Sequence, residues 1–130
     1  MVITYHNDTC FRVTSGKQSL VVDPASEKFK ADLVLRTRAE ILGSAATTNS
    51  SESSIYGGGE YEVQEIVARG IQADYDVKSG IVGTMYSVTL ENITMFFMGS
   101  ITNMPSAELL EKIGDVDILV VSKKSRPIMD

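Results

Sequence analysis

Short runs of β-favouring residues, each closed by turn residues after a few positions, constrain the fold of this chain most. Cys10–Thr14 and Ser19–Val22 are separated by a short turn that contains a glycine, which predicts a β-hairpin. Thr84–Leu90 and Ile93–Phe97 flank Glu91-Asn92, which predicts a second hairpin with a weaker turn signal than Asn-Gly. We therefore expect sheets built from short strands that tight turns connect.

Further strands and one helix follow from the same patterns. A proline at the start, Glu108 in the first turn and Gly114 at the end predict a helix from Pro105 to Ile113. Ala39–Leu42 fits a single helical turn. The remaining predicted strands are Val2–Tyr5, Ala31–Leu35, Glu60–Val63, Ile66–Ala68 and Asp117–Val121. Many strands, then a helix and a strand, predict an α/β (α+β) fold with a mixed, mainly antiparallel sheet and few helices.

Length, charge and cysteine content bound what the chain can be. Its 130 residues fit one domain, 1–130. A net charge of −5 argues against nucleic acid and anionic membranes as partners. The single cysteine, Cys10, excludes an intramolecular disulfide framework and fits a reducing compartment. With no signal-peptide pattern and no run of about 18 apolar residues, a cytoplasmic protein is predicted.

One stretch interrupts the strand pattern. Residues 44–54 are rich in Ser, Thr and Ala and show no hydrophobic period, which predicts a disordered or mobile loop. Strand-like residues resume directly after it, so we expect a loop within one domain rather than a boundary between two.

Three parts of the chain carry a family resemblance. The segments are Ile3–Phe11, Leu20–Pro24 and Ala31–Leu35, then Gly57–Val63 with Arg69–Ile71, then Ile113–Val121. In this order they resemble small metallo-β-lactamase-fold hydrolases, in particular the ascorbate-6-phosphate lactonase-like proteins. The resemblance implies an αββα sandwich. The family sandwich is longer and closes with further strands, so a partial, truncated version of it is expected here.

The resemblance also implies a two-metal hydrolytic site, held in the family by a His-x-His-x-Asp-His loop after the strand that matches Leu33–Leu35. The matching positions here hold Arg38, Glu40, Leu42 and Gly43, of which only the glutamate could bind a metal. A later histidine position of the family matches Tyr75, and the bridging aspartate position matches Ser100. Because the one histidine is His6, shifting the alignment by a residue restores nothing. The resemblance therefore indicates a degenerate member without its metal site.

Glu40, Asp74 and Asp76 are weak candidates for an oxygen-rich Mg²⁺ or Ca²⁺ site. In the alternative interpretation, Asp74 and Asp76 belong to a solvated loop, because no third ligand is near in the sequence. We assign no catalytic residue, no metal and no cofactor. If the emptied pocket stays buried, Arg38 and Glu40 are expected to pair there.

Three other patterns have both a functional and a structural interpretation. His6, Asp8 and Cys10 alternate on one face of an extended segment, as a nucleophile constellation would, but a lone cysteine in a strand is usually a small buried residue. Gly57–Gly59 lacks the remainder of a phosphate-binding loop. The basic residues of Lys123–Arg126 are typical of a solvated chain end.

The apolar run Met95–Met98 predicts a strand covered on both faces, either as core or partly as an oligomer interface. Because the family sandwich is longer, one sheet face of this chain would lack its cover. We expect that cover to come from a homo-oligomer or from a second chain. Met95–Met98 or Asp117–Val121 would form the contact. The predicted function is a non-catalytic metallo-β-lactamase-fold module with a structural, binding or self-association role. The alternative is a metal-dependent hydrolase of the same fold with a relocated oxygen-rich site.

Overall fold

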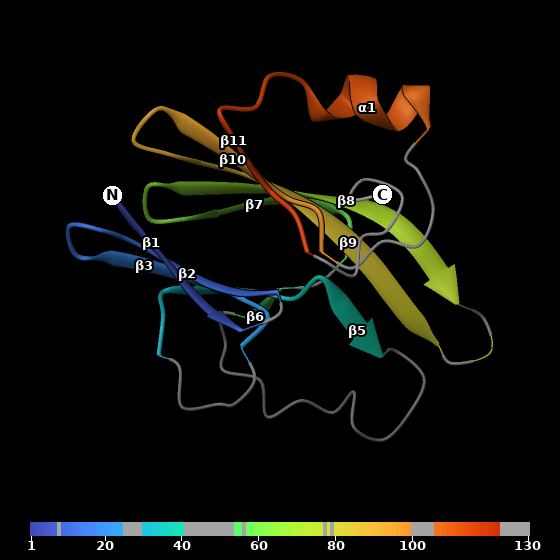
Figure 1. Cartoon of the computed structure of the whole chain (residues 1–130), viewed down its shortest axis with the longest axis horizontal. Coiled ribbons are helices and arrows are strands. Elements are labelled where there is room, and N and C mark those ends of the chain that lie inside the picture. The colour runs from blue at the N-terminus through green and yellow to red at the C-terminus, as the bar shows by residue number, and fades with distance from the viewer. Residues whose placement is uncertain are drawn as a thin grey trace.

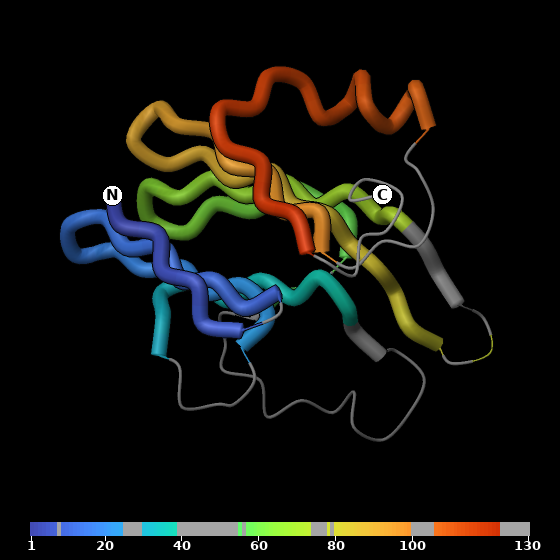
Figure 2. Tube along the Cα trace, in the orientation of Figure 1, coloured from blue at the N-terminus to red at the C-terminus, as the bar shows by residue number. Residues whose placement is uncertain are grey.

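The tight turns fold the described part of the chain into two stacked β-sheets with one helix outside them (Figure 1 and Figure 2). This computed structural model describes residues 1–7, 9–24, 30–40, 54–55, 57–76, 78, 80–99 and 106–122, with backbone only at 39, 40, 54 and 74–76. The predicted loop 44–54 lies outside these ranges apart from Ser54. The mixed, mainly antiparallel α+β fold expected from the sequence is confirmed.

The first sheet has the strand order β1-β2-β3-β4-β6. Its strands are β1 (Val2–Asn7), β2 (Cys10–Ser15), β3 (Gln18–Val22), β4 (Leu33–Leu35) and β6 (Ser54–Ile55). β1, β2 and β3 are antiparallel, and β4 and β6 continue the sheet in parallel. Gly16 occupies the β2–β3 turn at φ 56°, a conformation that glycine adopts without strain. The first predicted hairpin is thus confirmed.

The second sheet has the order β11-β10-β9-β8-β7, with β5 also paired to β9. Its strands are β5 (Arg38–Glu40), β7 (Gly59–Val63), β8 (Ile66–Asp76), β9 (Ile81–Leu90), β10 (Ile93–Phe97) and β11 (Ile118–Val120). Glu91 and Asn92 both have positive φ, which is the geometry of a two-residue hairpin turn. The second predicted hairpin is therefore also confirmed.

The helix α1 (Ala107–Ile113) connects the parallel strands β10 and β11. The side chain of Ser106 caps it by accepting a hydrogen bond from the backbone N of Leu109 at 3.2 Å. Gly114 ends the helix at φ 73°. The predicted helix is confirmed over these residues, and Pro105 lies outside the described ones. In the described ranges, no helix has the length and apolarity that a membrane span needs.

Two local predictions are wrong. Arg38–Glu40 form the strand β5, not the start of a helical turn, because they pair with β9 from Ile81 to Gly83. Asp74 and Asp76 lie in β8 rather than in a solvated loop, because a register shift after Gln72 lets the strand continue. Both errors arise from pairing with β9, which no local pattern signals.

Inward-facing residues of both sheets make the main core. Its fully buried members include Leu20 and Leu35 from the first sheet and Tyr86 and Phe97 from the second. A second cluster, with Phe96 and Met98 at its centre, packs beneath α1 on the outer face of the second sheet. Met95–Met98 is therefore buried within the chain on both faces. Its interpretation as core is confirmed, and its prediction as an oligomer interface is wrong.

Candidate functional site

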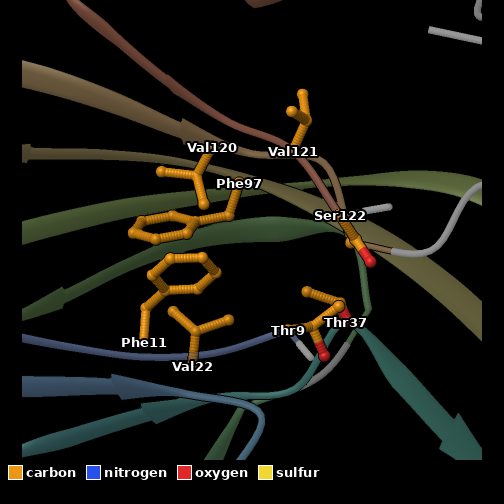
Figure 3. A pocket seen from close by; sticks show the side chains of 9 residues that line it. Thr9, Phe11, Val22, Thr37, Phe97, Val120, Val121 and Ser122 are labelled. Carbon is orange, nitrogen blue, oxygen red and sulfur yellow. The ribbon is translucent and has the colours of Figure 1, made fainter. Parts of the chain in front are cut away.

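The carboxyl ends of four strands meet at one end of the sandwich. Val22 at the end of β3 and residues that follow β4, β10 and β11 lie around a shared hollow between the sheets (Figure 3). We call this region the strand-end site and define it by Thr9, Asp23, Thr37, Gly99 and Ser122. Within a strand, side chains alternate between the buried and the outer face of the sheet. Residues beyond the strand ends are not bound by this alternation, so polar groups can gather there.

Asp23 and Thr37 form the polar centre of the strand-end site. The backbone N of Thr37 donates to Oδ1 of Asp23 at 2.7 Å, and the Thr37 hydroxyl donates to Oδ2. The backbone N of Asp23 donates to the carbonyl of Leu35 at 2.8 Å. Asp23 is held at φ 49°, a left-handed conformation that aspartate tolerates better than most residues. Both carboxylate oxygens are thus committed to fixing the chain where it leaves β4.

The surroundings of Asp23 shift the pKa of its carboxyl group. Burial raises the pKa of the Asp23 carboxyl above its ordinary value of 3.8, and hydrogen bonds from Thr37 and Thr9 and the charge of Arg36 oppose that rise. Because two donors of Thr37 already occupy both carboxylate oxygens, Asp23 acts as a structural acceptor.

The strand-end site is closely packed. An added Cβ on Gly99 would lie 2.7 Å from the Cβ of Thr37, and Gly99 itself has φ 65°. The rings of Phe11 and Phe97 approach with centroids 6.3 Å apart and close the inner side (Figure 3). The remaining cavity has a volume of about 10 Å³. That is room for about one water molecule, not for two metal ions and a substrate.

A second polar contact joins the two sheets behind the strand-end site. The buried hydroxyl of Tyr86 lies 2.8 Å from the carbonyl of Arg36 and 3.2 Å from that of Ile55, and it donates to them. Burial raises the pKa of Tyr86 well above its usual range. Tyr86 therefore remains a neutral donor and ties β9 to the ends of β4 and β6.

The glycine segment Gly57–Gly59 has a packing role here. The backbone N of Gly57 donates to Oγ1 of Thr84 at 3.2 Å, and its carbonyl lies where a side chain on Gly70 would begin. A strand, β7, follows this segment rather than a helix. Glycine at position 70 thus allows the two backbones to approach closely, and Gly57 has φ 91°, a conformation that glycine adopts without strain.

The positions matched to the family's metal ligands do not form one described cluster. Arg38 is exposed on β5, so the burial on which its expected pairing with Glu40 was conditional is not met at this position. Its expected pairing with Glu40 stays a prediction, because the Glu40 side chain is not among the described ones. Leu42, Gly43 and Ser100 lie outside the described residues.

The backbone register brings the three carboxylate candidates closer than their sequence positions suggest. Glu40 of β5 and Asp76 of β8 are both opposite Ile81 on β9, one on each side. Asp74 is opposite Gly83, two residues along, so all three occupy register positions on one face. Tyr75 is opposite Val82 and occupies the other face. All three carboxylates were candidates from the sequence, whereas the face that they share follows from the β5–β9 pairing, which is non-local.

The remaining candidates lie in the first sheet or outside the described residues. Cys10 is buried on β2, as its structural interpretation expects, and His6 is exposed on β1. β2 and β3 lie between β1 and β4. His6 is therefore about 14 Å of sheet width from the strand that leads to Arg38. Asp8 and Lys123–Arg126 lie outside the described residues.

The described donor set does not fit a dinuclear metal site of the kind the resemblance implies. Such a site needs several imidazoles and carboxylates. Around the strand-end site, Asp23 is engaged with Thr37, and Arg38 carries a positive charge. In the part of the chain that the structure describes, no group of three or more His, Cys, Asp or Glu side chains is placed to hold a metal ion.

Comparisons with known proteins agree with the fold. The family described as "Beta-lactamase superfamily domain" matches residues 2–129. A crystal structure from Thermotoga maritima, of a protein assigned to the Zn-dependent hydrolases of the metallo-beta-lactamase superfamily, superposes with a TM-score of 0.68 at 18% identity. The match covers 90% of this chain and 58% of that protein, so the chain spans less than two thirds of its length. No curated protein matches the chain.

Proposed function

The chain belongs to the beta-lactamase superfamily domain family, and we propose that within this family it is a non-catalytic module with a structural, binding or self-association role. The observation that carries the proposal is the residue set at the strand ends. Arg38 stands where the resemblance places the first metal-binding histidine, and the one histidine of the chain lies on β1. A guanidinium repels a divalent cation at the distances that coordination requires.

The second support is that the surviving polar residues are already used for folding. Asp23 accepts from both donors of Thr37, and Tyr86 donates to carbonyls at the ends of two strands. Neither residue offers an unused group to a substrate. On this proposal, the contacts that stabilise the family's fold are kept in this chain, whereas the residues that carry out the family's reaction are not.

A turnover assay tests the proposal. Protein supplied in turn with Zn²⁺, Mn²⁺ and Fe²⁺ is offered a panel of esters, lactones and phosphodiesters. We expect no metal-dependent turnover above that of metal in buffer alone. Turnover that scales with protein concentration and disappears with a chelator would overturn the proposal.

One observation favours the second candidate function, a hydrolase with a relocated oxygen-rich site. The register positions of Glu40, Asp74 and Asp76 share a face around β9, and oxygen ligands suit Mg²⁺ or Mn²⁺. This candidate predicts turnover that Asp76→Ala abolishes and that Glu65→Ala, an exposed glutamate in the β7–β8 turn, leaves unchanged. Equal rates in the two variants would contradict it.

A further inference from the structure

The edge strand β1 is exposed along its whole length. In the described part of the chain, β1 is the outer strand of the first sheet and pairs on one side with β2. All six of its residues are exposed, with Val2 60% and Tyr5 62% accessible to solvent. An edge strand presents unpaired backbone N–H and C=O groups, which are a template for another strand. The occupant that such an edge accepts is an extended segment.

The sequence of β1 lacks the features that prevent strand pairing. Val2–Asn7 contains no Lys, Arg, Asp, Glu or Pro. The outer strand β7 of the second sheet, by contrast, exposes Glu60 and Glu62. The N-terminal amine of Met1 lies 3.5 Å from Oε2 of Glu91, so its charge is balanced within its own chain. Charged residues and proline are the usual protection of an edge, and β1 has neither.

We propose that β1 pairs antiparallel with β1 of a second copy of this chain, with Thr4 on the two-fold axis. In this register Ile3 lies opposite the other copy's Tyr5, and the symmetry repeats that apolar pair. Val2 lies opposite the other copy's His6, and Thr4 faces Thr4. The pairing joins the two first sheets into one continuous sheet through an isologous contact.

A second copy fits this edge because β1 is complementary to itself. Cross-strand pairs of aromatic and β-branched residues stabilise antiparallel sheets, and Ile3 with Tyr5 supplies two of them per dimer. Tyr5 is already oriented by Phe11 on β2, whose ring centroid lies 5.2 Å away. In a chain of net charge −5, a charge-free strand is where two copies can meet with least repulsion.

The inference deepens the self-association role proposed above and rests on it. Six residues per strand make a contact smaller than that of a stable dimer, so a dissociation constant above about 1 μM is expected. The two proposals fail separately. Metal-dependent turnover would overturn the non-catalytic role, whereas a monomer at high concentration would overturn the pairing of β1.

Sedimentation velocity of the full chain from about 10 to 500 μM tests the pairing, since this range brackets the affinity of a small interface. The decisive variant is Thr4→Glu. Within one copy the new carboxylate lies opposite Arg12, which suits the monomer, whereas in the dimer two carboxylates meet at the axis. The matched control is Leu119→Glu, which puts the same charge at an exposed position of β11, an outer strand of the second sheet.

We expect the wild type and Leu119→Glu to dimerise with rising concentration, and Thr4→Glu to weaken dimerisation at least tenfold. Circular dichroism checks that both variants fold. A monomeric wild type over the whole range would overturn the proposal. Dimerisation lost in Leu119→Glu and kept in Thr4→Glu would overturn it too, because the contact would then lie at β11.

Crosslinking gives a second, independent readout. Thr4→Cys places two thiols at the axis, where a short bis-maleimide can bridge them, and the native Cys10 is buried. Val67→Cys is the control, because Val67 is also exposed but lies on β8. We expect covalent dimers at least fivefold more abundant with Thr4→Cys than with Val67→Cys. Equal yields would contradict pairing through β1.

Discussion

The core between the sheets and the strand-end site are built from the same strands but are constrained differently. In the core, successive residues of a strand point in turn to the inner and the outer face of the sheet. On the inner faces both sheets bury large side chains such as Leu35 and Phe97. At the strand-end site, residues lie just beyond that alternation. A residue there can therefore change without disturbing the alternation of the core. On the function proposed above, loss of the family's chemistry and retention of its fold are compatible for this reason.

The same contrast recurs between Thr37 of the strand-end site and its neighbour Arg38 in β5. Asp23 and Thr37 bind each other and hold the chain in place, while Arg38, one residue later, is exposed. We therefore expect folding to depend on Asp23 and Thr37 more than on Arg38. The predictions below test this contrast from the core outward.

The largest effect is expected in the core. Phe97→Ala removes a fully buried ring that contacts the first sheet, and we expect it to lower the free energy of unfolding by about 3–5 kcal/mol. Leu119→Ala, at a 55% exposed position, should change it by about 0.5 kcal/mol or less. Urea denaturation measures both. Similar losses in the two variants would contradict the assignment of the core.

An intermediate effect is expected at Gly99. Gly99→Ala forces an alanine into the left-handed backbone conformation and brings its Cβ too close to Thr37. We therefore expect the free energy of unfolding to fall by about 2–3 kcal/mol. Gly16→Ala is the matched control, because its φ is 56° and nothing lies within 4 Å of the added Cβ. It should cost about 1 kcal/mol. Equal losses on denaturation would mean that close packing at the strand-end site contributes nothing.

A smaller, pH-dependent effect is expected at Asp23. Its pKa is raised in the folded state, so its contribution to stability is full below about pH 4 and is lost as pH rises through the folded pKa. Asp23→Asn keeps an acceptor for Thr37 and removes this titration, with a change of about 1 kcal/mol or less at pH 7. Unfolding from pH 3 to 8 should show the wild type losing stability relative to the variant. A relative gain would contradict the buried carboxyl.

The smallest effect is expected at Arg38. Because Arg38 is exposed, Arg38→Ala should change the free energy of unfolding by about 0.5 kcal/mol or less. Thermal and urea unfolding compared with the wild type measure this difference. A loss above about 2 kcal/mol would show that folding depends on this position.

Local patterns predicted the hairpins and the helix well, because their signals are short-range. Glu91-Asn92, Gly16 and the helix-ending Gly114 each lie within a few residues of the element they define. The strand β5 could not be predicted in this way, since its partner β9 begins some forty residues later and decides its conformation. The face shared by Glu40, Asp74 and Asp76 was missed for the same reason.

The role of Met95–Met98 depended on α1. An apolar strand on both faces is compatible with core or interface, and the sequence left these alternatives open. The cluster of Phe96 and Met98 with Leu109 and Ile113 of α1 shows that the helix provides the cover. The association surface inferred above lies instead on the exposed edge β1.

Metal content tests the central claim most directly. Protein purified without chelator and washed by gel filtration is analysed by inductively coupled plasma mass spectrometry for zinc, manganese and iron. A scaffold without metal-binding chemistry predicts well below one equivalent of any of these metals per chain. One or two tightly bound equivalents per chain would contradict the account.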